Sequence, residues 1–182
     1  MPATAVSTIA LIAPIRTIER LANAALSPGH VMELMSTNKF RKNTRIARSA
    51  VVMVALEKEY DGKGVETAYA ADDQVLAGIF ARGSEVALRL PANAAAIVVG
   101  DVLETDGTGC VRKQVQGALI TSVGTGDGTI ADGTGTYSQT IFNNNFKDVA
   151  DAVNSLTGFA IALEAIDNSA VGNEVFIRAL IV

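Results

Sequence analysis

The sequence contains few of the residues that most catalytic and metal sites require. Its 182 residues include one cysteine, Cys110, one histidine, His30, and no tryptophan. A single cysteine excludes a disulfide within the chain, and one cysteine with one histidine is too few for a thiolate/imidazole zinc site. Charged residues are also scarce, at 19% of the chain, below the usual value of about 25%.

No catalytic motif is found in a supporting context. A serine triad would need His30 as its base, yet the chain has no G-x-S-x-G sequence. We interpret His30 as a half-buried histidine at the start of a strand, and Cys110 as a small buried apolar residue. The glycines at 124–128 lack the spacing of a dinucleotide or phosphate-binding loop, so they predict turns. We therefore predict a protein that is not an enzyme and has no metal or cofactor.

The apolar content favours a subunit of an assembly. Apolar residues make up 49% of the chain and the mean hydropathy is +0.30, which is high for a soluble monomer. Either the core is unusually large, or some apolar surface is buried against partner chains, which suits a subunit of an assembly. The net charge of −4 argues against nucleic acid as the main partner. The apolar run at 3–14 is shorter than the roughly 20 residues that cross a membrane and lacks the basic start of a signal peptide. We interpret it as a packing arm and expect no membrane partner.

The spacing of strand and turn signals predicts a mainly β protein with a barrel or sandwich architecture. We expect 75–80 and 85–90 to form a hairpin around Arg82-Gly83-Ser84, because both segments alternate apolar and polar residues. The predicted strands cover residues 30–35, 49–57, 75–80, 85–90, 102–105, 110–113, 159–166 and 174–182.

Three further segments complete the predicted organisation. Residues 15–26 fit either an apolar helix face or an extended segment, and the pattern leaves both open. A glycine-rich insert at about 123–145 predicts a long loop or exposed hairpin, and 146–156 is the best candidate for one short helix. The predicted domains are an N-terminal arm, residues 1–26, and a β domain, residues 27–182.

A cationic segment follows the first predicted strand in this acidic chain. It is either a solvated loop or an electrostatic contact for an acidic partner surface, with nucleic acid a weaker third choice because Phe40 is the only aromatic residue there. Its five cations are Lys39, Arg41, Lys42, Arg45 and Arg48.

Several short stretches, taken in order, resemble the head decoration (cement) proteins of tailed phages. Residues 25–34, ALSPGHVMEL, are similar to the opening "ALTPG(M/H)LVE" of that family. The stretch from Ala55-Leu56-Glu57 to Asp73-Gln74-Val75 resembles its "ALE…G…aYaaGDqV" run, with Ala71-Asp72 where the family has Ala-Gly. Four shorter matches follow in the expected order, at 82–86, 91–97, 100–103 and 106–107. Residues 161–167, IALEAID, are similar to the closing "GVALEAVD". The resemblance covers about 15–113 and 157–182.

The resemblance implies a small β-barrel or β-tulip fold with an extended N-terminal arm. It implies a homotrimer on the outer capsid surface of a virion, assembled in the host cytoplasm, that cements adjacent capsomers of the major capsid protein. The expected partner contacts are the cationic segment and apolar residues of the arm. Those apolar residues are Ile9, Leu11, Ile12, Ile15 and Ile18.

One alternative of a different class stays open. The chain could be a β-structured receptor- or glycan-binding module of a virion or cell surface, with the 123–145 loop as its binding tip. That interpretation predicts clustered exposed aromatic residues, and the loop offers only Tyr137 and Phe142.

Overall fold

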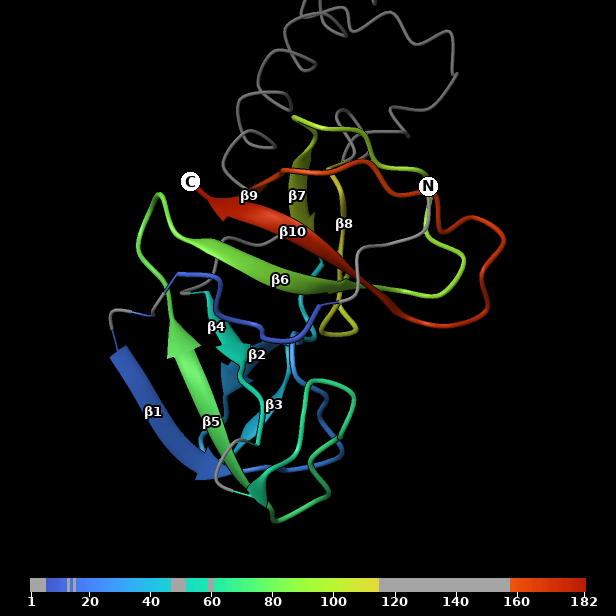
Figure 1. The fold of residues 1–182 in the computed structure, drawn as a ribbon. Helices are drawn as coiled ribbons and strands as arrows, with labels where there is room; N and C mark the ends of the chain where they lie inside the picture. Colours follow the sequence, from blue (N-terminus) through green and yellow to red (C-terminus); the bar gives the residue numbers. More distant parts are fainter. Residues whose placement is uncertain (1–5, 13, 15, 47–51, 59–60, 115–157) are drawn as a thin grey trace, which may run out of the picture. The chain divides into compact units, whose positions relative to one another are not determined.

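The described chain folds into two five-stranded antiparallel sheets (Figure 1). The structure, a computed structural model, describes residues 6–12, 14, 16–46, 52–58, 61–114 and 158–182. In spatial order the first sheet contains β1 (Arg16–Leu21), β5 (Gln74–Ile79), β4 (Met53–Ala55), β2 (Val31–Leu34) and β3 (Phe40–Lys42). The second contains β6 (Glu85–Leu90), β10 (Val175–Ile181), β9 (Ala160–Ala162), β7 (Val102–Thr105) and β8 (Val111–Lys113).

The prediction of a mainly β protein is confirmed, but the described strands of neither sheet close into a barrel. In the first sheet the two outer strands approach each other at one bridge, between Ala22 after β1 and Phe40 in β3. None of the described residues forms a helix that could cross a membrane. The predicted helix at 146–156 and the glycine-rich insert at 123–145 lie outside the described residues.

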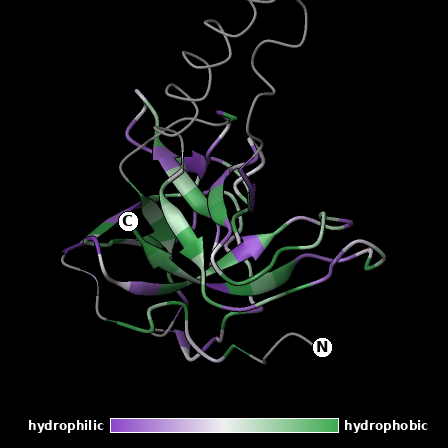
Figure 2. Cartoon of the chain, turned by 90° about the horizontal axis from the view of Figure 1, so that it is seen from above, coloured by the Kyte–Doolittle hydropathy of each residue, from purple (hydrophilic) through white to green (hydrophobic). Residues whose placement is uncertain are grey.

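The first sheet buries apolar side chains on both faces. Along β2, Val31 belongs to the larger core, which also contains Leu88 of β6 and Ile177 of β10, whereas Met32 belongs to a smaller core around Tyr69. Successive side chains of a strand point to opposite faces, so this division follows from the period of two. Apolar residues (green) are visible along many of the strands in Figure 2.

The predicted hairpin of 75–80 and 85–90 is wrong. The turn between them forms, with Gly83 at φ 86° and the Ser84 N–H bonded to Ala81 O. However, β5 pairs with β1 and β4 in the first sheet, while β6 pairs with β10 in the second. The alternating pattern fixes which face of a strand is buried, but not which strand lies beside it.

Four of the other predicted strands are present as β7 to β10, although β9 (Ala160–Ala162) is shorter than the predicted 159–166. β7 and β8 pair across the turn at 106–109, and β9 pairs with β10. Of the two possibilities for 15–26, the extended one is correct, because β1 (Arg16–Leu21) pairs along its whole length with β5.

The described part of the N-terminal segment packs on its own chain. Ile9 is fully buried in the larger core, and its carbonyl accepts a hydrogen bond from Ala87 N in β6. The buried carboxylate of Glu57 accepts hydrogen bonds from Ile9 N and from the Thr8 hydroxyl. The segment therefore lines one edge of the second sheet, opposite the edge of β6 that pairs with β10.

Candidate functional site

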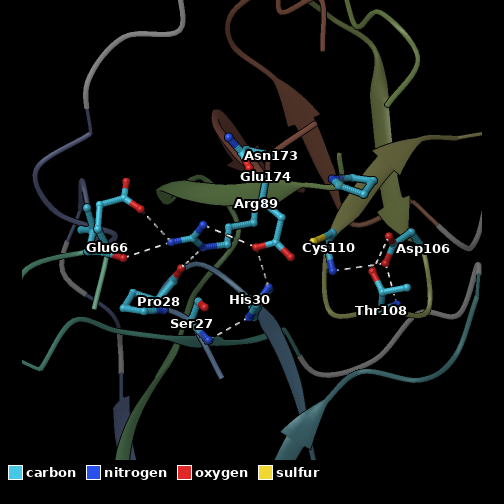
Figure 3. Close-up of polar contacts among 12 residues, drawn as sticks. Ser27, Pro28, His30, Glu66, Arg89, Asp106, Thr108, Cys110, Asn173 and Glu174 are labelled. Atoms are coloured by element: carbon cyan, nitrogen blue, oxygen red, sulfur yellow. Dashed lines mark hydrogen bonds and ion pairs between the residues drawn. The ribbon is translucent and has the colours of Figure 1, made fainter. Parts of the chain in front are cut away.

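The chain's only histidine and only cysteine meet in the interior, where the turn at 27–30 lies against the second sheet. With Arg89 of β6 and Glu174, the residue before β10, they form a cluster of ionisable groups that we name the junction cluster (His30, Arg89, Cys110, Glu174) (Figure 3). His30, Arg89 and Cys110 are buried, and the Glu174 side chain is half-buried. This cluster has no sequence signal, because its members lie far apart in the chain.

Arg89 holds the turn to the second sheet. Its Nε donates to Pro28 O at 2.7 Å and its Nη2 to Val65 O at 3.1 Å, both main-chain carbonyls of loops around the first sheet. Its Nη1 lies 3.4 Å from Glu174 Oε2, and its guanidinium lies 4.4 Å from the centroid of the Phe176 ring. Because a buried charge is costly unless it is paired and hydrogen-bonded, these contacts make Arg89 a structural anchor.

Both ring nitrogens of His30 have partners. Ser27 N donates to Nδ1 at 2.9 Å, which identifies Nδ1 as the unprotonated nitrogen. The proton of the neutral ring is therefore on Nε2, which lies 3.1 Å from Glu174 Oε2. Burial, then the positive charge of Lys42, lowers the pKa of His30 to about 4, although Glu174 acts in the opposite direction.

Cys110 is not an activated nucleophile. Burial, followed by the negative charges of Glu174 and Asp106, raises the pKa of its thiol to about 12. A reactive cysteine needs an environment that stabilises the thiolate, such as an imidazolium. Here the neighbouring imidazole is held neutral, so the pair has the opposite arrangement from a catalytic cysteine–histidine couple.

The cluster does not fit a metal ion, even though ligand atoms of His30, Cys110 and Glu174 lie within 4.8 Å of one another. A neutral imidazole that binds a metal through Nε2 carries its proton on Nδ1 and donates it to an acceptor. The partner of Nδ1 here is the Ser27 N–H, which is a donor. Arg89 also places a positive charge beside Glu174, the carboxylate of these three residues. The arrangement therefore favours a hydrogen-bonded structural role.

The predicted apolar contact residues of the arm differ in their exposure. Ile9 is buried in its own chain, whereas Leu11 and Ile12 are 37% and 47% exposed. Ile18 is partly buried against the core around Tyr69, and Ile15 lies outside the described residues. Of the predicted apolar contact residues that the structure describes, Leu11 and Ile12 are thus the most exposed.

Three of the five predicted cationic contacts form ion pairs within the chain, with two carboxylates between them. Lys39 pairs with Asp72 at 2.5 Å, and Arg41 pairs with Glu33 at 2.6 Å. Arg45 is 3.9 Å from the same glutamate and remains 59% exposed. Lys42 makes no ion pair with any described residue, and Arg48 is not among the described residues. These pairs reduce the positive field that the sequence alone suggests, because each carboxylate screens the cation beside it.

An exposed apolar surface lies on two segments that run side by side. Backbone hydrogen bonds join Asn93 N to Val171 O, Ile97 N to Ile166 O, and Gly100 N to Ala162 O. We name residues 93–100 and 165–171 the apolar ribbon. Ile97 and Ile166 are buried beneath it, while Val98 and Val99 are 56% and 65% exposed. Asp167 is its only charged residue, and the uncharged run Asn93 to Gly100 was the sequence signal for it.

The chain was also compared with known proteins. A scan against protein-family models gives no match, and a search of curated proteins finds no similar sequence.

Proposed function

We propose that this chain is a non-catalytic structural protein that binds the outer surface of a phage capsid and cements adjacent capsomers as a homotrimer. The observation that carries the proposal is the order of the decoration-protein motifs along 15–113 and 157–182. Nearly the same two stretches, 1–114 and 158–182, form one compact unit of the fold. Several short matches in one consistent order are more specific than isolated matches. The finer fold that we propose is the small barrel or β-tulip of that family.

The surface of the described unit supports a role in an assembly. The apolar ribbon and the pair Leu11 and Ile12 expose large apolar side chains that a stable monomer usually buries or disperses. The junction cluster offers no activated nucleophile, which agrees with a binding role. Many modest contacts become a strong attachment when three copies bind together.

Direct binding and assembly measurements test the proposal. The purified chain is incubated with undecorated phage heads, and co-sedimentation and sedimentation velocity are measured. We expect the chain to pellet with the heads and to sediment alone as a trimer. A monomer that stays in the supernatant contradicts the proposal.

Changing both Leu11 and Ile12 to serine is expected to weaken head binding at least tenfold, since the proposed contact buries these two side chains. Ile9 must be kept, because it belongs to the core of its own chain and its removal would confound binding with folding. The matched control is Leu34→Ser, which changes a similarly apolar, 50% exposed residue of β2. Equal binding by the double variant and the wild type would remove these residues from the contact.

Arg45→Glu is expected to weaken head binding more at low than at high ionic strength, because salt screens exposed charges over roughly 10 Å at 0.1 M. Lys39, Arg41 and Arg45 each form an ion pair with a described residue. Of these three, Arg45 has the most exposed side chain. Arg82→Glu makes the same charge change at an exposed position away from the segment. If both variants show the same salt dependence, the cationic segment has no specific electrostatic role.

A further inference from the structure

We propose that the junction cluster is an acid-sensitive contact between the turn at 27–30 and the second sheet. As the pH falls, the chain increasingly populates a locally open state. In that state His30 reaches water and Cys110 becomes accessible, while both sheets remain folded. This inference concerns the conformation of the chain and is independent of the proposed capsid function.

The hydrogen bonds of His30 make its neutral form part of the folded structure. Its Nδ1 accepts from Ser27 N, and Nε2 donates to Glu174 (Figure 3). A second proton would have to sit on Nδ1, where it would face the Ser27 N–H and replace a hydrogen bond by a contact between two donors. Protonation is therefore compatible only with a rearranged turn or an open cluster.

The charges around the imidazole reinforce this effect. Glu174 before β10 favours the imidazolium, whereas Arg89 of β6 and Lys42 of β3 oppose it. Cys110, on the remaining side, is a neutral thiol, and Asp106 acts on that thiol. Burial is the largest contribution of all. The net result is a site where a neutral ring is favoured.

The direction of the pH dependence follows from the lowered pKa. An exposed histidine has a pKa of 6.5, whereas His30 in the closed cluster has a pKa of about 4. The open state therefore binds more protons between these values, so the stability of the closed state is fully present above pH 6.5 and is lost progressively down to about pH 4. By this linkage the ratio of open to closed molecules rises about 20-fold between pH 7 and pH 5.

The structure provides its own reporter of this opening. Cys110 is the only thiol of the chain, it is buried, and it lies within 4.8 Å of the ligand atoms of His30 and Glu174. The segment before Glu174, residues 169–173, is exposed. Movement of this segment would take Glu174 away from His30 and uncover the thiol without separating the paired strands.

Labelling of Cys110 by 4,4′-dithiodipyridine tests the proposal with the full chain. Rates at pH 7 and pH 5 are divided by those of a short cysteine peptide at the same pH, and circular dichroism monitors the sheets. We expect the normalised rate to rise about 20-fold at pH 5 with an unchanged spectrum. In His30→Gln and His30→Asn, which hydrogen-bond but do not titrate, we expect a rise of less than about twofold, since the linkage needs a titrating ring.

Three results would overturn the proposal. The first is a pH-independent normalised rate in the wild type, which decides the matter even if both variants misfold. The second is an equal rise in a folded variant. The third is an opening free energy from labelling that equals the free energy of global unfolding in urea at both pH values, because the opening would then not be local.

Discussion

Replacing Arg89 with alanine is expected to lower the free energy of unfolding by about 4 kcal/mol, because it breaks a buried network in which one side chain serves several partners. The carbonyls of Pro28 and Val65 would lose their donor, and Glu174 would lose a cation. The substitution also removes the guanidinium from the Phe176 ring and leaves a cavity. Urea unfolding followed by circular dichroism measures the change.

Arg178→Ala is the matched control for Arg89→Ala. Arg178 lies on β10, pairs with Glu85 at 3.0 Å and has a side chain 45% exposed. Exposed ion pairs contribute about 0–1 kcal/mol, so its loss should be within that range. If the two variants lost equal stability, Arg89 would not be the anchor between the turn and the second sheet.

Gly29→Ala is expected to lower the free energy of unfolding by about 3 kcal/mol, since two unfavourable effects add at this position. Gly29 has φ 86°, where a side chain is strained, and an added Cβ would lie 2.8 Å from Phe176 Cε1 and 3.2 Å from Arg89 Cγ. The new methyl group would therefore push the turn away from the side chains that hold it. A fall in the urea midpoint with an unchanged slope would report this loss.

Gly83→Ala separates the two effects. Gly83 has the same φ of 86°, but nothing lies within 4 Å of its added Cβ. The free energy of unfolding of this variant should fall by only about 1 kcal/mol, which is the cost of placing alanine at a positive φ. Equal losses in the two glycine variants would mean that close packing at Gly29 contributes nothing to stability.

Local structure was predictable from sequence where a short pattern fixes it. β6 (Glu85–Leu90) and β7 (Val102–Thr105) have the predicted bounds, and the turn after β7 places Gly107 and Gly109 at positive φ, as glycine-rich turns do. Asp72, which stands where the resembling family has glycine, also has a positive φ of 65°. Aspartate tolerates that region better than most residues.

Contacts between distant segments were not predictable. The pairing partner of β5 and β6 depends on the whole topology, which two alternating segments do not encode. The ion pairs of the cationic segment were not predictable, because Glu33 belongs to the preceding strand at 30–35 and its distance from the cations depends on strand pairing. Its register opposite Arg41 in the β2–β3 pair brings the two charges together. The junction cluster likewise needs the fold to bring residues 30, 89, 110 and 174 to one place.

The pairing of β6 with β10 has a consequence for the rate at which the protein folds. In that ladder Glu85 lies opposite Leu180 and Leu90 opposite Val175, so the second sheet joins parts of the chain that are far apart in sequence. Closing such long loops costs entropy before any contact compensates, and proteins dominated by distant pairings fold in milliseconds to seconds. A chain shortened before β10 would leave β6 without this neighbour, and its exposed backbone would favour aggregation over folding.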